Sequence, residues 1–101
     1  MASQKAMAGY ANWVRHMAGD PRMLATHVSL YAALFICWQR QGFIQPFIIS
    51  RRELMEFSKI ASIATYHKCI KELDVCGYIC YQPTYHPRNG SLVYWPDWTN
   101  N

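Results

Sequence analysis

Apolar positions in the first part of the chain recur with the period of a helix. Within residues 4–19 they follow one another at steps of four, three, one and three residues, which places them on one face that must be buried. Asp20 and Pro21 then mark the end of this helix. The residues of the apolar face are Ala6, Tyr10, Trp13, Val14 and Met17.

A second helix is predicted over residues 27–41, and it is apolar on almost every side. Thr26 is a suitable N-cap, and Gly42 is the residue type that commonly closes a helix. Residues 28–38 are apolar except for Ser29, a run too short to span a membrane, which takes about 20 residues. A helix of this kind lies at the centre of a domain, so we expect the first helix to cover one of its sides. The expected core residues are Leu30, Tyr31, Leu34, Phe35 and Trp38.

A brief helix with a clearly marked start follows a β-prone segment at residues 47–49. Ser50 and Glu53 have the spacing of a capping box, in which each side chain accepts a hydrogen bond from the other residue's main chain. Ile49 and Leu54 have the spacing of a hydrophobic staple, which fixes the angle at which the chain enters the helix.

A further helix is expected after a break at residues 58–61, with Ser62 as its N-cap and its end near Val75. One face of this helix is apolar and the other is polar. The apolar face consists of Ile63, Tyr66, Ile70 and Leu73.

The last elements are two β-prone runs, residues 78–82 and 91–95, which we expect to form a hairpin. Asn89 and Gly90, which precede the second run, are a frequent hairpin turn pair. Both runs are rich in aromatic residues that are suited to stacking on unpaired bases, but strand alternation more simply places half of them in the core.

The order of these elements predicts an α+β fold, mostly α, of the winged helix-turn-helix class. A long helix, a short strand, two helices joined by a tight turn, and a hairpin follow one another as in that fold. The 101-residue chain is long enough for one such domain without disulfides. Residues 27–95 would form its core, and residues 4–18 would be an accessory N-terminal helix.

In a winged helix the second helix of the pair enters the major groove of DNA. Because the apolar face of this helix turns to the core, its opposite face carries the candidate contacts. Ser62 and Thr65 are suited to base edges or phosphates, Ala64 to a thymine methyl group, and Lys68 and Lys71 to phosphates.

Two further groups of residues extend the predicted DNA surface. Arg51 and Arg52 lie beside a helix N-terminus and are suited to phosphate contact. At the tip of the hairpin, the polar residues His86, Arg88 and Asn89 would reach the minor groove or the neighbouring backbone. Acidic residues at positions 72 and 74 would repel phosphate, which limits the expected surface to the first two turns of the helix; the lysines alone are equally typical of a solvated surface.

Charge and cysteine content change this picture little. Ten Lys and Arg against six Asp and Glu give a net charge of +4, which weakly favours an anionic partner. The four cysteines form no C-x-x-C pair, so we expect reduced thiols in the cytoplasm. A zinc site can be drawn, but its spacing matches no common module, and we expect neither a metal nor a cofactor. That site would use His67, which we expect to be partly buried, with Cys69, Cys76 and Cys80.

No signature of catalysis is present in the sequence. There is no Gly-rich phosphate loop and no cysteine set with a histidine in a known pattern. The N-terminus also lacks the charged and apolar regions of a secretory signal. We therefore expect a cytoplasmic protein that is not an enzyme.

Several segments carry a resemblance to a known family: HVSLY (27–31), ISRRE (49–53), SKIAS (58–62), ATYHKC (64–69), KEL (71–73) and GYI (77–79). Together they resemble small winged-helix proteins, described as transcriptional regulators, that are carried on mobile elements of anaerobic gut bacteria. The layout is more distantly similar to the DNA-binding domains of phage and plasmid replication initiators. The resemblance spans residues 27–95 and implies the fold more directly than the activity.

These observations predict a sequence-specific, non-catalytic protein that binds double-stranded DNA in transcription regulation or in the maintenance of a mobile element. We expect a homodimer formed through the N-terminal helix, because DNA sites of this class are often doubled and this helix exceeds what a minimal winged helix needs. The alternatives are a winged helix that serves as a protein-interaction module, favoured by the sparse charge, and an accessory of replication initiation.

Overall fold

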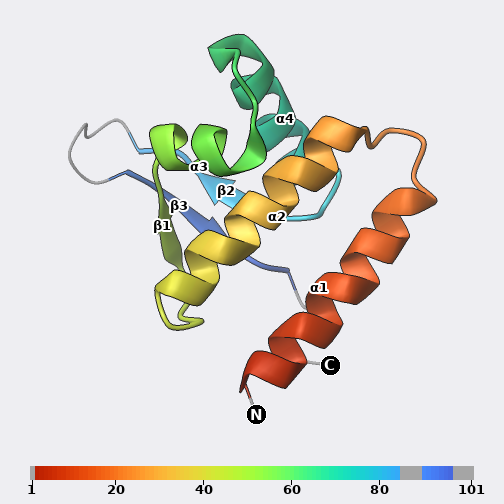
Figure 1. Cartoon of the computed structure of the whole chain (residues 1–101), viewed down its shortest axis with the longest axis vertical. Helices are drawn as coiled ribbons and strands as arrows, with labels where there is room; N and C mark the ends of the chain where they lie inside the picture. The colour runs from red at the N-terminus through yellow and green to blue at the C-terminus, as the bar shows by residue number, and fades with distance from the viewer. Residues whose placement is uncertain (1, 85–89, 97–101) are drawn as a thin grey trace.

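Helices and short strands in the predicted order make up the part of the chain that the computed structural model describes, residues 2–84 and 90–96 (Figure 1). The mostly helical α+β class is thereby confirmed, with a three-stranded antiparallel sheet. In chain order the elements are α1 (Ala2–Ala18), α2 (Ala25–Arg40), β1 (Phe47–Ile49), α3 (Arg51–Ser58), α4 (Ile63–Val75), β2 (Cys80–Gln82) and β3 (Ser91–Tyr94).

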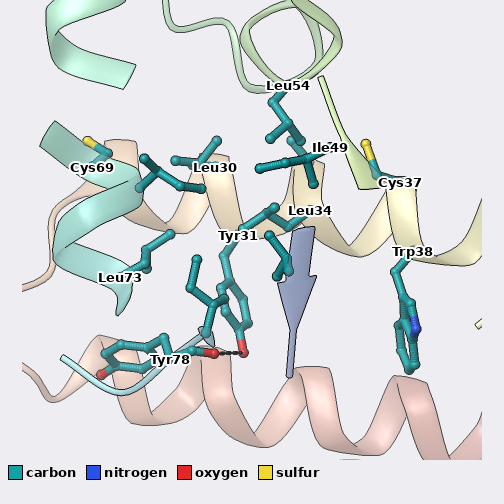
Figure 2. Close-up of a cluster of buried hydrophobic side chains, with 14 of the residues drawn as sticks. Leu30, Tyr31, Leu34, Cys37, Trp38, Ile49, Leu54, Cys69, Leu73 and Tyr78 are labelled. Atoms are coloured by element: carbon teal, nitrogen blue, oxygen red, sulfur yellow. Dashed lines mark hydrogen bonds between the residues drawn. The ribbon is translucent and has the colours of Figure 1, made fainter. Parts of the chain in front are cut away.

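In Figure 1 the central helix α2 lies between α1 and the two helices α3 and α4. Leu30, Tyr31 and Leu34 are fully buried, and Figure 2 shows them among side chains from β1, α3 and α4. The Tyr31 hydroxyl donates a hydrogen bond of 3.3 Å to the carbonyl of Tyr78, so its one polar atom is satisfied inside the core. The expectation of a central, apolar second helix is confirmed; Phe35, which was expected in the core, is half-buried at its edge.

The sheet has the order β1-β3-β2, with both pairs antiparallel. Val93 on the central strand pairs with Phe47 on one side and Tyr81 on the other, and Phe47 and Val93 are fully buried. Gly90, just before β3, has a φ of 64° and lies so close to β1 that an added Cβ would be 2.8 Å from the Ile49 carbonyl oxygen. A glycine is therefore required where the chain enters β3.

The aromatic face of α1 packs inside the same chain. Tyr10 lies on Phe35 with ring centroids 4.6 Å apart, and Trp13 lies edge-on to Tyr78 at 5.4 Å. Met17 is buried. The apolar stripe predicted for this helix is therefore used to cover α2 and the segment that enters β2.

The beginnings of two helices differ from the sequence prediction. Thr26 is not the N-cap of α2, because the helix begins two residues earlier than predicted, at Ala25, with Leu24 as its N-cap. The leucine side chain has no acceptor for a cap bond; instead Nδ1 of His27 accepts a hydrogen bond of 2.9 Å from the Leu24 main-chain N–H. At α3, Ser50 accepts from the Glu53 N–H as predicted, but the Glu53 carboxylate turns to the Cys37 thiol, 3.0 Å away, instead of completing the capping box.

Main-chain groups at both edges of the sheet are bonded by side chains. The Gln41 carboxamide accepts from the Ile48 N–H at 3.0 Å and donates to the Ile48 carbonyl at 2.7 Å, as a neighbouring strand would. On the opposite edge, the Tyr81 N–H donates to the Asp74 carboxylate at 3.4 Å. These bonds occupy groups through which another strand would otherwise pair with the sheet.

We expect Gln41→Ala to destabilise the protein by about 1 kcal/mol, because two hydrogen bonds to β1 are lost while water replaces part of them. The freed edge should also increase self-association at high concentration. Urea unfolding and light scattering measure the two effects. Gln39→Ala, at another exposed glutamine of α2, is the matched control; equal effects of both substitutions would contradict the role of Gln41.

Asp20 fastens the connection between α1 and α2 to the core, and its charge should make stability depend on pH. Hydrogen bonds from the Arg22 side chain and main chain, and from the Tyr78 hydroxyl, hold the pKa of this carboxyl well below its usual range. Its contribution is therefore present above the unfolded-state pKa, about 3.9, and is lost as the pH falls below that value.

Asp20→Asn should accordingly be less stable than the wild type at neutral pH, and the difference should shrink at about pH 3. Urea unfolding at the two pH values measures it, with Glu56→Gln, at an exposed carboxylate, as the control. A difference that stays constant between the two pH values would show that the charge of Asp20 is not responsible.

Candidate nucleic-acid interface

A short turn joins α3 to α4 and is anchored on α2. Lys59 ends α3 in the left-handed conformation, with a φ of 65°, and Ile60 then enters the core. Ser29 of α2 donates a hydrogen bond to the carbonyl of Ser58. Ser62 caps α4 by accepting from the Thr65 N–H at 3.2 Å, as the sequence predicted. The geometry of the two helices is thereby fixed from inside the fold.

Five of the ten predicted contact residues belong to α4 and its N-cap. Ala64, Lys68 and Lys71 are exposed, as is Ser62, and Thr65 is half-buried. In Figure 1 this helix lies at the top of the molecule, beyond α3 and on the far side of α2 from α1. Its exposed side is therefore not covered by α1.

The apolar face of α4 differs from the predicted one at its start. Tyr66, Ile70 and Leu73 are buried as expected, but Ile63 is 50% exposed. Ile60, from the turn, occupies the core at this end, and Cys69 joins the buried face farther along. Helical spacing gives the direction of a face but not the point at which the core ends, which explains why the prediction for Ile63 was wrong.

His67 is also misplaced by the sequence prediction, because it is exposed rather than partly buried. It lies on the outer side of α4, next to Lys68, and its ring meets that of Tyr66 edge-on at 5.3 Å. An exposed imidazole at this position offers one donor and one acceptor beside the predicted base-reading residues. Its position in a polar run of the helix was the signal that could have identified it.

Five basic residues of α3, the turn and α4 are exposed. Arg51 and Arg52 lie in the first turn of α3, Lys59 in the turn, and Lys68 and Lys71 on α4. Within residues 2–84 and 90–96, none of the five forms an ion pair. Lys59 was not among the predicted contacts; its basic side chain in the break between two helices was the available signal.

Three of the four acidic residues of α3 and α4 are bonded to other parts of the fold, whereas Glu56 of α3 is exposed. Glu72 lies 3.0 Å from the His27 imidazole, and its side chain is 41% exposed. Asp74 accepts from the Tyr81 N–H, and Glu53 accepts from the Cys37 thiol and lies 3.6 Å from Arg40. The carboxylates at positions 72 and 74, which we expected to restrict the surface, are thus directed to α2 and β2.

Three predicted contacts at the hairpin tip, His86, Arg88 and Asn89, lie outside the described residues. The two strands that would carry the tip, β2 and β3, pair as expected. Support for the interface therefore comes from α3, the turn and α4.

The zinc site that was drawn from the sequence does not assemble in the described part of the chain. His67 and Cys80 are exposed, whereas Cys69 is buried. A different trio, His27, Cys69 and Glu72, has potential ligand atoms within 4.8 Å of one another.

The hydrogen bonds of His27 do not suit a metal ligand. Its Nδ1 accepts from the Leu24 N–H, so the proton of the neutral ring lies on Nε2 and is donated to Glu72. A metal bound at Nε2 would require the ring proton to sit on Nδ1. There it would point at the Leu24 N–H, so that two donors would face each other. The trio is better explained as a buried link between α2 and α4.

Cys37 has the surroundings of a structural thiol. Burial, together with its bond to Glu53, raises the pKa of this thiol to about 12, so it stays protonated at neutral pH. A protonated thiol is a weak nucleophile and a poor metal ligand.

We find no helix in the described ranges with the length and apolar content needed to cross a membrane.

Comparison with protein-family models, with curated proteins and with solved structures found no match for this chain. The resemblance to winged-helix regulators thus stays a prediction.

The link through His27 should be important for stability. His27→Ala leaves the Leu24 N–H without its acceptor and removes a side chain that is 1% exposed, so we expect a loss of about 2–3 kcal/mol in the free energy of unfolding. Urea unfolding measures the loss. His67→Ala, an exposed histidine, should change it by less than about 0.5 kcal/mol, and a similarly small effect at His27 would contradict this assignment.

Proposed function

We propose that this protein binds double-stranded DNA through α4, as a winged helix-turn-helix protein that catalyses no reaction. The observation that carries the proposal is the distribution of charge on α3, the turn and α4. Five exposed cations have no acidic partner in the described ranges, whereas Glu53, Glu72 and Asp74 are bonded to other residues of the fold and Glu56 alone of the four acidic residues is exposed. A surface of this kind favours contact with phosphates.

The order and pairing of the elements support the same proposal. A helix, a strand, two helices joined by a short turn and two more strands, with the first strand at the edge of the sheet, agree with a winged-helix arrangement. In this arrangement α4 would enter the major groove. Ser62, Ala64 and Thr65 would meet base edges, and the basic residues would contact the backbone. Residues 86, 88 and 89 would belong to the wing and reach the adjacent backbone or minor groove.

The biological role follows from the resemblance of the sequence to regulators of bacterial mobile elements. We propose that the protein acts on transcription in the cytoplasm, or as an accessory of replication initiation. A homodimer on a doubled site stays part of the proposal. The structure gives less reason to place the dimer interface on α1, because Tyr10, Trp13 and Met17 of this helix pack within the chain.

A second candidate is a protein-interaction module. Ile44 and Ile48 are 65% and 54% exposed near β1, away from the basic residues of α4 in the sequence. Apolar residues of this size are suited to a protein partner. Binding to such a partner would respond little to salt, whereas phosphate contacts weaken steeply as salt rises.

We expect the wild-type protein to bind a pool of random duplexes and to enrich a defined sequence from it, with affinity that falls steeply between about 50 and 200 mM salt. Combined Lys68→Ala and Lys71→Ala substitution should lower the slope of log affinity against log salt by about 2, one for each lost phosphate contact. Adding Thr65→Ala should weaken the preference for the enriched sequence.

The matched control is Lys5→Ala with Arg15→Ala, which removes the same charge from exposed positions on α1. Equal losses in the control and in the α4 variant would show that only the net charge matters and that α4 is not the contact. Absence of duplex binding at the lower salt would favour the protein-interaction function.

A further inference from the structure

The start of α4 presents an apolar side chain where the proposed interface would meet DNA. Ile63, the first residue of the helix, is 50% exposed, and Ala64 beside it is exposed as well. The core below them is already closed by Ile60, which is 6% exposed. The exposed part of Ile63 therefore has no role in packing the fold.

Charged groups flank this pair along the chain. Lys59 precedes it in the turn, and Lys68 and Lys71 follow on the same side of α4 as Ala64, at spacings of four and seven residues. If these lysines contact phosphates on either side of the major groove, the pair between them faces the base edges.

The surroundings of the pair argue against a second copy of the chain as its occupant. A twofold contact at this point would bring the lysines of one copy against those of the other. Two exposed side chains also supply much less than the roughly 800 Å² per partner of a stable protein interface. An anionic partner with small apolar groups fits better.

In the major groove the apolar group of the four standard bases is the C5 methyl of thymine. We infer that Ile63 and Ala64 read thymine methyl groups, so that the bound sequence contains one or two T·A pairs where the N-terminus of α4 enters the groove. This inference rests on the proposed DNA-binding function. It makes Ile63 a specificity-determining residue whose contact is apolar and independent of phosphate charge.

The test replaces single thymines of the selected duplex by uracil, which lacks only the methyl group. Uracil at one or two positions should weaken wild-type binding about fourfold each, the value expected for one buried carbon group. In Ile63→Ala the penalty at one of these positions should disappear. The salt dependence of binding should be unchanged, because an apolar contact releases no counterions.

Ile48→Ala is the matched control, since Ile48 is 54% exposed on β1 and far from α4 in the sequence. It should retain the full sensitivity to uracil, and urea unfolding establishes that both variants fold. If uracil weakens binding at no position, or if Ile63→Ala keeps every uracil penalty, the inference is overturned while salt-sensitive duplex binding leaves the proposed function intact. If no duplex is bound, both are overturned.

Discussion

The arrangement of the whole domain depends on burying α2, a helix that is apolar on almost every side. Such a helix is stable in water only if other elements cover it, and α1, α3, α4 and β1 all contact it. Tyr31 illustrates how completely α2 is buried, since its ring is fully buried and its hydroxyl donates a hydrogen bond to the Tyr78 carbonyl. Because α2 is covered on several sides, the angle between α3 and α4 is set by the core and not by the turn alone.

Polar links then fix α4 against this core. His27 joins the first turn of α2 to Glu72, and Ser29 holds the end of α3. These links also affect the surface, because a carboxylate that is bonded to the interior repels an anion at the surface less strongly. On α4, where two lysines are matched by two acidic residues, both acidic side chains are bonded to other elements and both lysines are exposed.

The sequence predicted local features well and long-range ones poorly. Ser50, Ser62 and Gly42 act on main-chain atoms within a few residues, so their positions alone located the ends of three helices. Thr26 failed as an N-cap because a histidine three residues into the helix supplied the acceptor instead. Ile63 and His67 failed because helical spacing gives the direction of an apolar face but not the limit of the core, which other elements set; at the start of α4 the buried position is taken by Ile60 of the preceding turn. The partners of Glu53 and Glu72 lie on α2, beyond the reach of any local pattern.

Because the apolar face of α1 packs against its own chain, this face is not available for assembly with a second copy. Its aromatic residues are committed to Phe35 and Tyr78, so opening them for a partner would expose the side of α2 that they cover. The edges of the sheet are a poor alternative, since Gln41 and Asp74 already bond main-chain groups there. Met7, 56% exposed on α1, and Ile44 and Ile48 near β1 are large apolar side chains that stay accessible in the described ranges without disturbing the core. A dimer on DNA that leaves the core of each copy intact would form through exposed side chains of this kind, with α4 left free on each copy.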